Sequence, residues 1–236
     1  MKTRFFQLLL AALLSASAAA QAGGINIHTS LGGGVEVRID NGKPRAGNGQ
    51  TSTVSRSLPA YRRIELRSAE NLRAVIAPAA TLQLTGDSNL LELVGTRVQG
   101  DTLIIEALGS YRSRTPILVS VQLPVLDAVQ VEGSADAVVS GLAAERFKVE
   151  ISGSGNIEAS GSAHELEVAL DGSGNAALRA LAAQRAVVEI NGSGNVTVQA
   201  RERLRAEING SGDIRYGGAP AEVKAEVNGS GRIRPL

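Results

Sequence analysis

A three-residue motif recurs six times in the C-terminal half of the chain, and its spacing constrains the fold more than any other feature. Gly-Ser-Gly or Gly-Ser-Ala begins at Gly133, Gly153, Gly172, Gly192, Gly210 and Gly229. Successive copies are separated by 20, 19, 20, 18 and 19 residues. Six copies at a nearly constant period are typical of a solenoid in which every repeat forms one coil.

The residues between the motifs indicate that each coil is built from strands. Positions two, four and six residues before the last five copies are apolar; they are Ile151, Leu170, Ile190, Ile208 and Val227, then Val149, Val168, Val188, Ala206 and Ala225, then Phe147, Leu166, Ala186, Leu204 and Val223. A spacing of two places them on one face of a strand, and equivalent residues of neighbouring strands stack about 4.8 Å apart. The sequence therefore predicts an all-β fold, a single-stranded parallel β-helix (β-solenoid) with a period of about 19–20 residues. A leucine-rich repeat has a similar period, but its signature is absent.

The motif itself predicts sharp turns between strands. Glycine adopts a positive φ at little cost, so it suits the corners of a coil. Asn156, Asn175, Asn195 and Asp213 follow the turns, where such residues tolerate left-handed backbone and bond to their neighbours. We expect replacement of Gly194 by valine to destabilise the protein far more than replacement of the outward-facing Gln199.

The preceding part of the chain also has the pattern of strands. Six short segments separated by turn residues look extended, namely 64–66, 72–76, 82–84, 90–94, 103–107 and 117–123. We therefore assign residues 58–236 to one solenoid domain whose repeats are clearest at 133–236. Residues 23–57 are rich in Gly, Ser, Thr and Asn, and they predict a flexible N-terminal segment.

The first 22 residues have the pattern of a secretory signal peptide. Lys2 and Arg4 precede an apolar run, and Ala20-Gln21-Ala22 matches an A-x-A cleavage site. The run is too short for a membrane anchor, and no later stretch reaches the length of a transmembrane helix. We expect an exported protein, periplasmic or extracellular in a Gram-negative bacterium, with no integral membrane segment.

Composition excludes several classes of function. The chain has no cysteine, which removes disulfides, thiolate nucleophiles and cysteine metal sites. Without residues 1–22 it would carry 22 basic and 23 acidic residues, so charge gives no argument for binding nucleic acid. The chain has no tryptophan and only three tyrosines, and few aromatic side chains are left on which a sugar ring could stack.

Several segments resemble a known bacterial family. They are Tyr61–Ile64, Leu82–Leu91 with its Gly86-Asp87-Ser88-Asn89 turn, Gly100–Ile105 and the repeated Gly-Ser-Gly-Asn. Taken together they are similar to the head-GIN domain family of putative autotransporter adhesins, from about Thr51 to Leu236. The resemblance implies an exported β-solenoid with an adhesin-like role.

No residue pattern indicates a catalytic, cofactor or metal site. His28 and His164 are the two histidines, and neither has a second histidine at ligand spacing. The serines of the six motifs are too uniform to mark a nucleophile. The Gly-Ser-Gly-Asn segments lack the lysine of a P-loop. A calcium-binding β-roll needs an aspartate in every turn, and only Asp136 and Asp213 follow the motif here.

One surface column is nevertheless distinctive. Glu150, Ala169, Glu189, Glu207 and Glu226 share the outward position before successive turns, beside Lys148, Glu167, Val187, Arg205 and Lys224. The acidic column could bind a cation or a basic partner. The simpler interpretation, which we prefer, is a solvated face on which the basic residues offset the glutamates, each exposed pair contributing less than about 1 kcal/mol.

These observations favour a non-enzymatic β-solenoid with an adhesin-like, binding or scaffolding role in the bacterial envelope. The partner is not identified; an envelope polymer, a glycan or a protein surface would each fit. The alternative is a carbohydrate-active enzyme, a polysaccharide lyase or hydrolase, which would need clustered carboxylates in a cleft. Self-association through the solenoid ends is a further interpretation, because an end exposes a strand edge unless it is capped. Pro235 and the two arginines Arg232 and Arg234 could form such a cap.

Overall fold

The computed structural model describes residues 28–29, 35–36 and 43–236. The expected signal peptide, residues 1–22, lies outside these ranges. Almost every regular element described is a strand. In chain order they are β1 (His28–Thr29), β2 (Val35–Glu36), β3 (Arg45–Ala46), β4 (Thr51–Arg56), β5 (Arg63–Leu66), β6 (Asn71–Ile76), β7 (Thr81–Asp87), the 3-10 helix η1 (Leu91–Leu93), β8 (Val94–Gln99), β9 (Thr102–Ala107), β10 (Tyr111–Arg112), β11 (Leu118–Leu123), β12 (Ala128–Gly133), β13 (Asp136–Gly153), β14 (Asn156–Gly172), β15 (Asn175–Gly192), β16 (Asn195–Gly210), β17 (Asp213–Gly217), β18 (Glu222–Gly229) and β19 (Arg232–Pro235).

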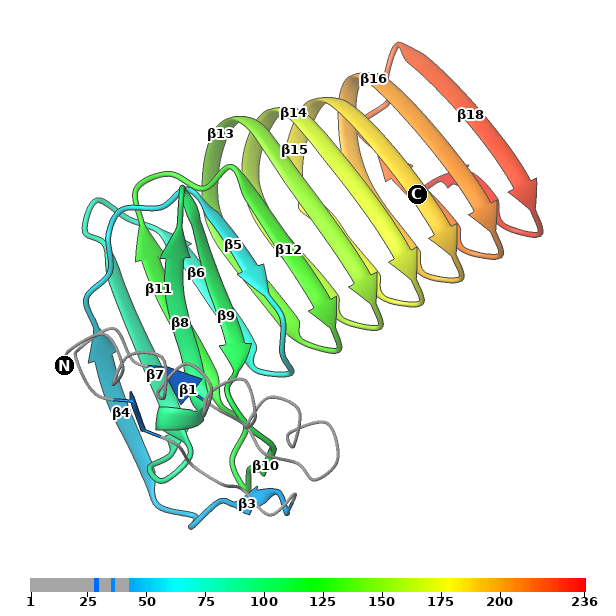
Figure 1. The fold of residues 1–236 in the computed structure, drawn as a ribbon. Coiled ribbons are helices and arrows are strands. Elements are labelled where there is room, and N and C mark those ends of the chain that lie inside the picture. The colour runs from blue at the N-terminus through cyan, green and yellow to red at the C-terminus, as the bar shows by residue number, and fades with distance from the viewer. Residues whose placement is uncertain (1–27, 30–34, 37–42) are drawn as a thin grey trace, which may run out of the picture.

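The repeats form a parallel β-solenoid, as predicted (Figure 1). Strands β13 to β16 each make one coil, which begins just after one glycine motif and ends at the first glycine of the next. Equivalent residues are paired in register along the stack, for example Val149 with Val168 and Val168 with Val188. Each long strand bends near its middle, where the register shifts.

Because each coil bends once, the strands form two facing layers. The front sheet contains the second halves of β13 to β16, together with β12, β5, β9 and β8 on one side and β18 on the other. The back sheet contains the first halves, together with β6, β11, β7 and β4 on one side and β17 and β19 on the other. Both termini of a coil's strand are therefore held at the same glycine-containing edge.

The core between the two sheets consists of stacked aliphatic ladders. Val149, Val168, Val188 and Ala206 are each at most 1% exposed, and Phe147 is buried in the same layer. Small and medium side chains fill the gap because the layers are thin and every coil must present the same width. The low aromatic content of the chain is therefore a property of this core.

From Gly153 onward, a Cβ on either glycine of a motif would lie within 2.5 Å of a backbone carbonyl oxygen of the preceding coil, and the two glycines differ in backbone conformation. The first glycine has a positive φ in all six copies, as expected for a corner. The second does not: a Cβ on Gly194 would lie 2.1 Å from the carbonyl oxygen of Gly174 in the preceding coil. The prediction that Gly194 is needed for a left-handed backbone is therefore wrong in its reason, because the constraint is the close approach of stacked coils.

This constraint has a direction, which explains the one copy with alanine. A side chain at the second position points toward the preceding coil. On that side of the first turn lie β5 and β6, which pair with β12 and β13, but no atom lies within 4 Å of a Cβ built on Gly133. This turn therefore has more room than the later ones, and Ala135, which is 1% exposed, occupies its second position.

Asparagine ladders run along both sides of the turns. After the turn, Asn156 donates from Nδ2 to Oδ1 of Asp136 (2.8 Å), and Asn175 and Asn195 continue the ladder at 2.8 and 3.0 Å. Before the turn, the amides of Asn191, Asn209 and Asn228 donate in the same manner, starting from Asp171. Every one of these amides donates toward the preceding coil, and each ladder starts at an aspartate, which only accepts. In the ladder after the turn, Asp213 follows Asn195 and has no amide to continue it. Asparagine side chains thus form hydrogen bonds between coils.

The N-terminal coils are stacked out of sequence order. In the front sheet β5 lies between β9 and β12, and in the back sheet β6 lies between β11 and β13. The coil formed by residues 63–76 is thus inserted between the coil formed by 102–123 and the first glycine-motif coil. Beyond it, β8, β7 and β4 pair antiparallel and end the stack.

Two local expectations differ from the structure. Residues 90–94 form η1 and the start of β8, because the buried Leu90, Leu91 and Val94 must all face the core, which an extended strand cannot achieve. In the segment 23–57, Thr51–Arg56 form β4 and pair with β7. Arg56 anchors this strand by donating to the carbonyl oxygens of Val94 (2.6 Å) and Leu91 (2.9 Å).

The C-terminal end of the solenoid differs from the N-terminal end. Residues 232–235, considered above as a cap, form the last strand, β19, with exposed Arg232, Arg234 and Pro235. Val223 and Val227 of β18 are 42% and 40% exposed although they occupy core positions. Among the described residues, no helix has the length and apolar character needed to cross a membrane.

Candidate binding surface

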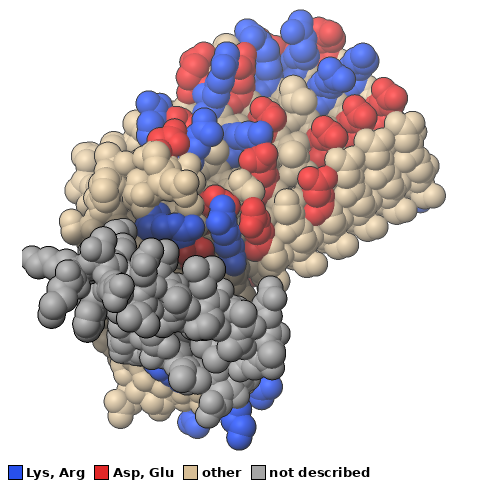
Figure 2. Space-filling view, viewed as in Figure 1, with Lys and Arg blue, Asp and Glu red and all other residues tan. Residues whose placement is uncertain are grey.

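Most charged side chains of the solenoid project from the outer face of the front sheet. Side chains alternate inward and outward along each strand, and the outward ones stack in columns because the coils are in register. Figure 2 shows rows of acidic and basic side chains over this sheet. Three columns make up this charged face: Arg146, Glu165, Arg185, Arg203 and Glu222; Lys148, Glu167, Val187, Arg205 and Lys224; and Glu150, Ala169, Glu189, Glu207 and Glu226.

The first column is a chain of ion pairs between coils. Glu165 lies between two arginines, with Arg146 at 2.9 Å and Arg185 at 3.1 Å. Further along, Arg203 contacts Glu222 at 2.7 Å. These residues are exposed or half-buried, so the pairs orient the side chains more than they stabilise the fold.

Lys148 links the second and third columns. Its Nζ lies 2.9 Å from Glu150 on the same strand and 3.4 Å from Glu167 on the next coil. The hydrogen bond to Glu150, with the nearby charges of both glutamates, raises the pKa of Lys148 above its ordinary value. The ammonium group is therefore held between two carboxylates across the two coils.

The acidic column is partly neutralised by its neighbours. Glu207 lies 4.0 Å from Arg205 and accepts a hydrogen bond from the amide of Asn209 (3.3 Å). Glu189 accepts a hydrogen bond from Asn191 (3.1 Å). Among the described residues, basic side chains therefore offset two of the four glutamates in this column, Glu150 and Glu207. Among the residues that the structure describes, no group of three or more His, Cys, Asp or Glu side chains is placed to hold a metal ion.

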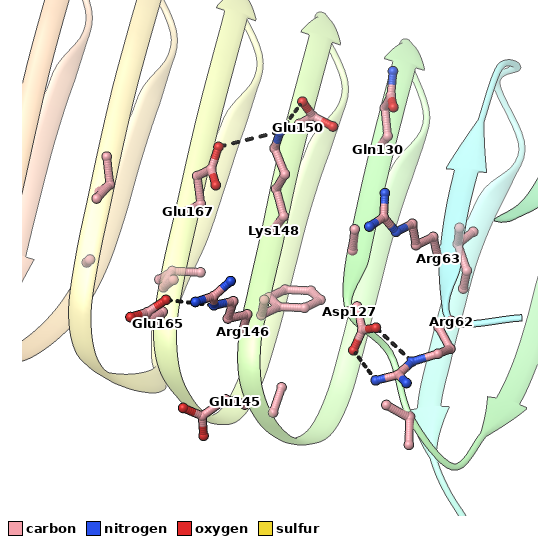
Figure 3. A pocket seen from close by; sticks show the side chains of 18 of the residues that line it. Arg62, Arg63, Asp127, Gln130, Glu145, Arg146, Lys148, Glu150, Glu165 and Glu167 are labelled. Carbon is pink, nitrogen blue, oxygen red and sulfur yellow. Dashed lines mark hydrogen bonds and ion pairs between the residues drawn. The ribbon is translucent and has the colours of Figure 1, made fainter. Parts of the chain in front are cut away.

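A hollow of about 920 Å³ lies on this face over β5, β12, β13 and β14 (Figure 3). Arg62 and Asp127 form one side of it and are joined by an ion pair of 2.7 Å. Lys148 and Glu165 project over the neighbouring coils. Phe147 is the aromatic residue of the lining, and only 1% of it is exposed, because its ring belongs to the core.

The carboxylates of the hollow differ from those of a glycosidase cleft. Such a cleft presents two carboxyl groups to the substrate. Here Asp127 pairs with Arg62, Glu165 with Arg146 and Arg185, and both Glu150 and Glu167 with Lys148. Glu65 pairs with Arg67. Glu145 also lines the hollow, and none of the ion pairs among the described residues includes it. Apart from Glu145, the carboxylates of the hollow are held in ion pairs, which can bind polar groups by exchanging partners.

The outer face of the back sheet is chemically different. Its central column of outward residues is Arg73, Val138, Glu158, Ala177, Thr197 and Arg215. Three of these six side chains are charged, compared with thirteen of the fifteen in the three columns of the charged face, and Val138 is 39% exposed. The two faces therefore offer different surfaces to a ligand, and the charged face is the better candidate.

His164 does not belong to the three charged columns. His164 is half-buried near the bend of β14 and borders a smaller hollow of about 420 Å³, with Glu145 and Arg201 also in its lining. The structure places His164 within β14. His28 belongs to β1, and its side chain lies outside the described part of the structure.

Two buried acidic residues were not singled out by the sequence. Asp87 accepts hydrogen bonds from the backbone amides of Gly49 (2.7 Å) and Arg114 (2.8 Å) and from the hydroxyl of Ser113 (2.8 Å). Burial alone would raise the pKa of Asp87, but these bonds, with that from Thr115, outweigh it and lower the pKa. Asp87 thus ties two loops together, and its Gly-Asp-Ser-Asn context resembles an ordinary turn.

Glu70 is the second buried acid. It accepts hydrogen bonds from the hydroxyl groups of Ser68 and Tyr111. Burial, followed by the bond to Glu70, raises the pKa of Tyr111. No pattern in the sequence could have joined residues 70 and 111, because Glu70 and Tyr111 lie 41 residues apart and come together only after the coils are stacked out of order.

Comparison with known proteins is consistent with this architecture. A family model described as "putative auto-transporter adhesin, head GIN domain" matches residues 60–220. The chain belongs to this head GIN family. The resemblance stated from the sequence is thereby confirmed, and the match covers the N-terminal coils and nearly all of the glycine-motif repeats.

Solved structures share the fold. A "putative adhesin" from Bacteroides fragilis superposes with a TM-score of 0.68 at 19% identity, covering 81% of this chain and 99% of that one. A "putative lipid binding protein" from Parabacteroides distasonis gives 0.56 at 24% identity, with coverages of 82% and 100%. A "putative adhesin" from the same organism gives 0.54 at 23% identity, with the same coverages. No curated protein matches the chain.

Proposed function

We propose that this head GIN protein is an exported, non-enzymatic β-solenoid that binds a polymer of the bacterial envelope through its charged face. In this proposal residues 1–22 are the export signal, 23–57 are a leading segment and 58–236 are the solenoid. The compartment is the periplasm or the cell exterior of a Gram-negative bacterium. The adhesin-like names of the family and of the structural neighbours support a binding role.

One observation carries the proposal: the charged face repeats cations and anions from coil to coil over a flat sheet. A ligand that replaces these ion pairs must itself offer both signs of charge at a short, regular spacing. Peptidoglycan is an exported polymer of this kind, because its peptides carry carboxylates and amines along a regular glycan. Each exchanged surface pair contributes little, so affinity would come from many weak contacts along the polymer.

The paired carboxylates and the buried Phe147 argue for binding rather than cleavage. A hydrolase or lyase would need carboxyl groups that face the substrate, and usually aromatic walls. In the hollow the carboxylates of Asp127 and Glu165 already contact arginines at 2.7 and 2.9 Å. The carbohydrate-active alternative is kept as an outcome of the experiment below.

Co-sedimentation with purified peptidoglycan sacculi tests the proposal. We expect the protein to sediment with sacculi, and we expect binding to weaken as salt rises, because exposed charges are screened. The double variant Lys148→Gln/Arg185→Gln should bind roughly tenfold less. Arg215→Gln, on the back sheet, is a control that removes one exposed cation, where the front-sheet variant removes two, and it should bind as the unaltered protein does.

Three outcomes would contradict the proposal. Absence of sedimentation at low salt would exclude sacculi as the ligand. Equal losses in Arg215→Gln and in the front-sheet variant would exclude the charged face. Release of soluble fragments from sacculi or from soluble polysaccharides during incubation would replace the proposal by the enzymatic alternative.

A further inference from the structure

The last coil leaves a strand edge and part of the core uncovered. Within the described residues, β18 pairs only with β16, and β19 pairs only with β17. Val223 and Val227 are 42% and 40% exposed, whereas Leu204 and Ile208, their equivalents one coil earlier, are fully buried. The same side chains that form the core elsewhere are therefore open to solvent here.

The free edge also presents unpaired backbone groups in a known pattern. In the column that includes Lys148, the backbone N–H points to the preceding coil, since Lys148 donates to Asp127 (2.9 Å). Lys224 belongs to this column. In a parallel ladder alternate residues bond to opposite neighbours. Val223, Ala225 and Val227 therefore direct their N–H and C=O groups to the free edge.

We propose that the free edge of β18 pairs antiparallel with β18 of a second copy, around a two-fold axis that passes through Ala225. In this register Val223 lies opposite Val227 of the second copy. Lys224 lies opposite Glu226 of the second copy, and the reverse pairs follow by symmetry. An isologous contact of this kind closes on itself and yields a dimer joined tip to tip.

The charges of Lys224 and Glu226 favour this pairing register over registers in which the two-fold axis passes through a neighbouring residue. Moving the axis to Glu226 places Glu226 opposite itself, and moving it to Lys224 places Lys224 opposite itself. Like charges directly opposite each other on antiparallel strands are destabilising. A shift of one residue in the pairing would place core-facing side chains opposite solvent-facing ones. Within the described residues neither Lys224 nor Glu226 forms an ion pair, so both are available to the second copy.

The backbone pattern fits the same register. Val223, Ala225 and Val227 would each lie in a hydrogen-bonded pair of the antiparallel ladder, giving about six N–H···O bonds across the axis. The Lys224–Glu226 pairs would then be the non-hydrogen-bonded ones, in which side chains approach more closely. The exposed valines of both copies would become continuous with the two cores.

The geometry of the back sheet is compatible with this pairing of two copies. Ala225 lies four residues before Gly229, and Pro235 lies four residues after Gly231, so the axis passes near Pro235. The two copies of β19 then meet only at their ends. Arg232 and Arg234 of one copy do not face those of the other, and Pro235 has no N–H to leave unpaired.

Sedimentation equilibrium of the exported chain over a range of concentrations tests the proposal. We expect a reversible monomer–dimer equilibrium. Lys224→Glu places two pairs of like charges across the axis and should weaken the dimer roughly tenfold or more. Glu226→Lys should do the same. The double variant Lys224→Glu/Glu226→Lys restores opposite charges and should dimerise like the original chain, as should an equimolar mixture of the two single variants.

A variant that removes one backbone N–H tests the pairing of the two copies without changing any charge. Ala225→Pro deletes an N–H that points to the free edge, so the pairing with β16 remains while the dimer is lost. Circular dichroism melting curves verify that each variant is folded. A strict monomer at all concentrations would overturn the proposal, as would a dimer that persists unchanged in Ala225→Pro and Lys224→Glu. Loss without rescue in the charge-swapped double variant would also overturn the assigned register.

Discussion

The close contact between stacked turns can be tested by adding a single Cβ atom to one glycine. Gly194→Ala adds one Cβ, which would lie 2.1 Å from the carbonyl oxygen of Gly174 and 2.6 Å from Cδ2 of Leu170. Gly194 does not have a positive φ, so backbone strain contributes nothing at this position. The variant therefore isolates the steric limit on how closely two coils approach.

The magnitude follows from the bonds that hold the turn. Relief of the overlap needs a separation of about 1 Å, since real Cβ contacts essentially never fall under 3.0 Å. Ser193 donates to Gly172 at 2.8 Å and Asn195 donates to Gly174 at 3.2 Å. An added 1 Å takes both bonds beyond useful length. Two backbone bonds at about 1 kcal/mol each, with about 1–3 kcal/mol for overpacking, give a loss of about 3–5 kcal/mol.

Urea unfolding followed by far-ultraviolet circular dichroism measures this loss. Two controls separate the possible causes. Gly133→Ala introduces a Cβ at a φ of +100° with no atom within 4 Å, so it should cost only the left-handed strain of about 1–2 kcal/mol. Ser193→Ala changes an exposed side chain in the same turn and should stay within about 0.5 kcal/mol of the original.

The reasoning would be refuted by either of two results. The first is a loss of stability in Gly194→Ala no larger than that in Ser193→Ala, which would mean that the coils separate freely. The second is a loss of stability in Gly133→Ala larger than that in Gly194→Ala, which would mean that backbone conformation rather than coil contact dominates at the motif.

Three further predictions concern ionisable and amide groups. Asn156→Asp should destabilise the protein at neutral pH, because its carboxylate would face that of Asp136; urea midpoints should recover partly on acidification, when a protonated carboxyl can donate. The lowered pKa of Asp87 means that its contribution is present above its unfolded pKa of about 3.9 and is lost as pH falls through the folded pKa. The urea midpoint of Asp87→Asn should therefore lie below that of the original chain at pH 7 and converge with it in acid. Burial raises the pKa of Tyr61 to about 12, so ultraviolet titration should show a tyrosinate step near pH 12 that Tyr61→Phe removes, and an alkaline loss of stability between about pH 10 and 12.

The glycine-motif repeats could be predicted almost completely from the sequence. A constant period, alternation with a spacing of two, and small residues at corners are local rules, and each coil repeats them. The pairing of Val149 with Val168 follows directly from counting residues between turns. The charged columns are predictable in the same way, because register follows the period.

Counting residues between turns could not predict the individual ion pairs or the buried acidic residues. Lys148 contacts Glu150 and Glu167, but which carboxylate a flexible lysine reaches depends on side-chain rotamers. Asp87 binds residues 49 and 113–115, which approach each other only through the cap of antiparallel strands. The hollow over β5 and β12 has the same origin, since residues 62–65 reach this place only by insertion between later coils.

Within the glycine-motif repeats, the sequence by itself determined the period, the direction of the side chains beside each motif and the position of the turn at each motif. These properties depend on neighbours along one coil and on stacking against an identical coil. Tertiary structure alone decided the order of the first coils, the antiparallel cap at one end and the exposed valines at the other. The reason is physical: inside the repeat each coil has equivalent neighbours on both sides, whereas at an end the contacts come from segments distant in the chain, or from none.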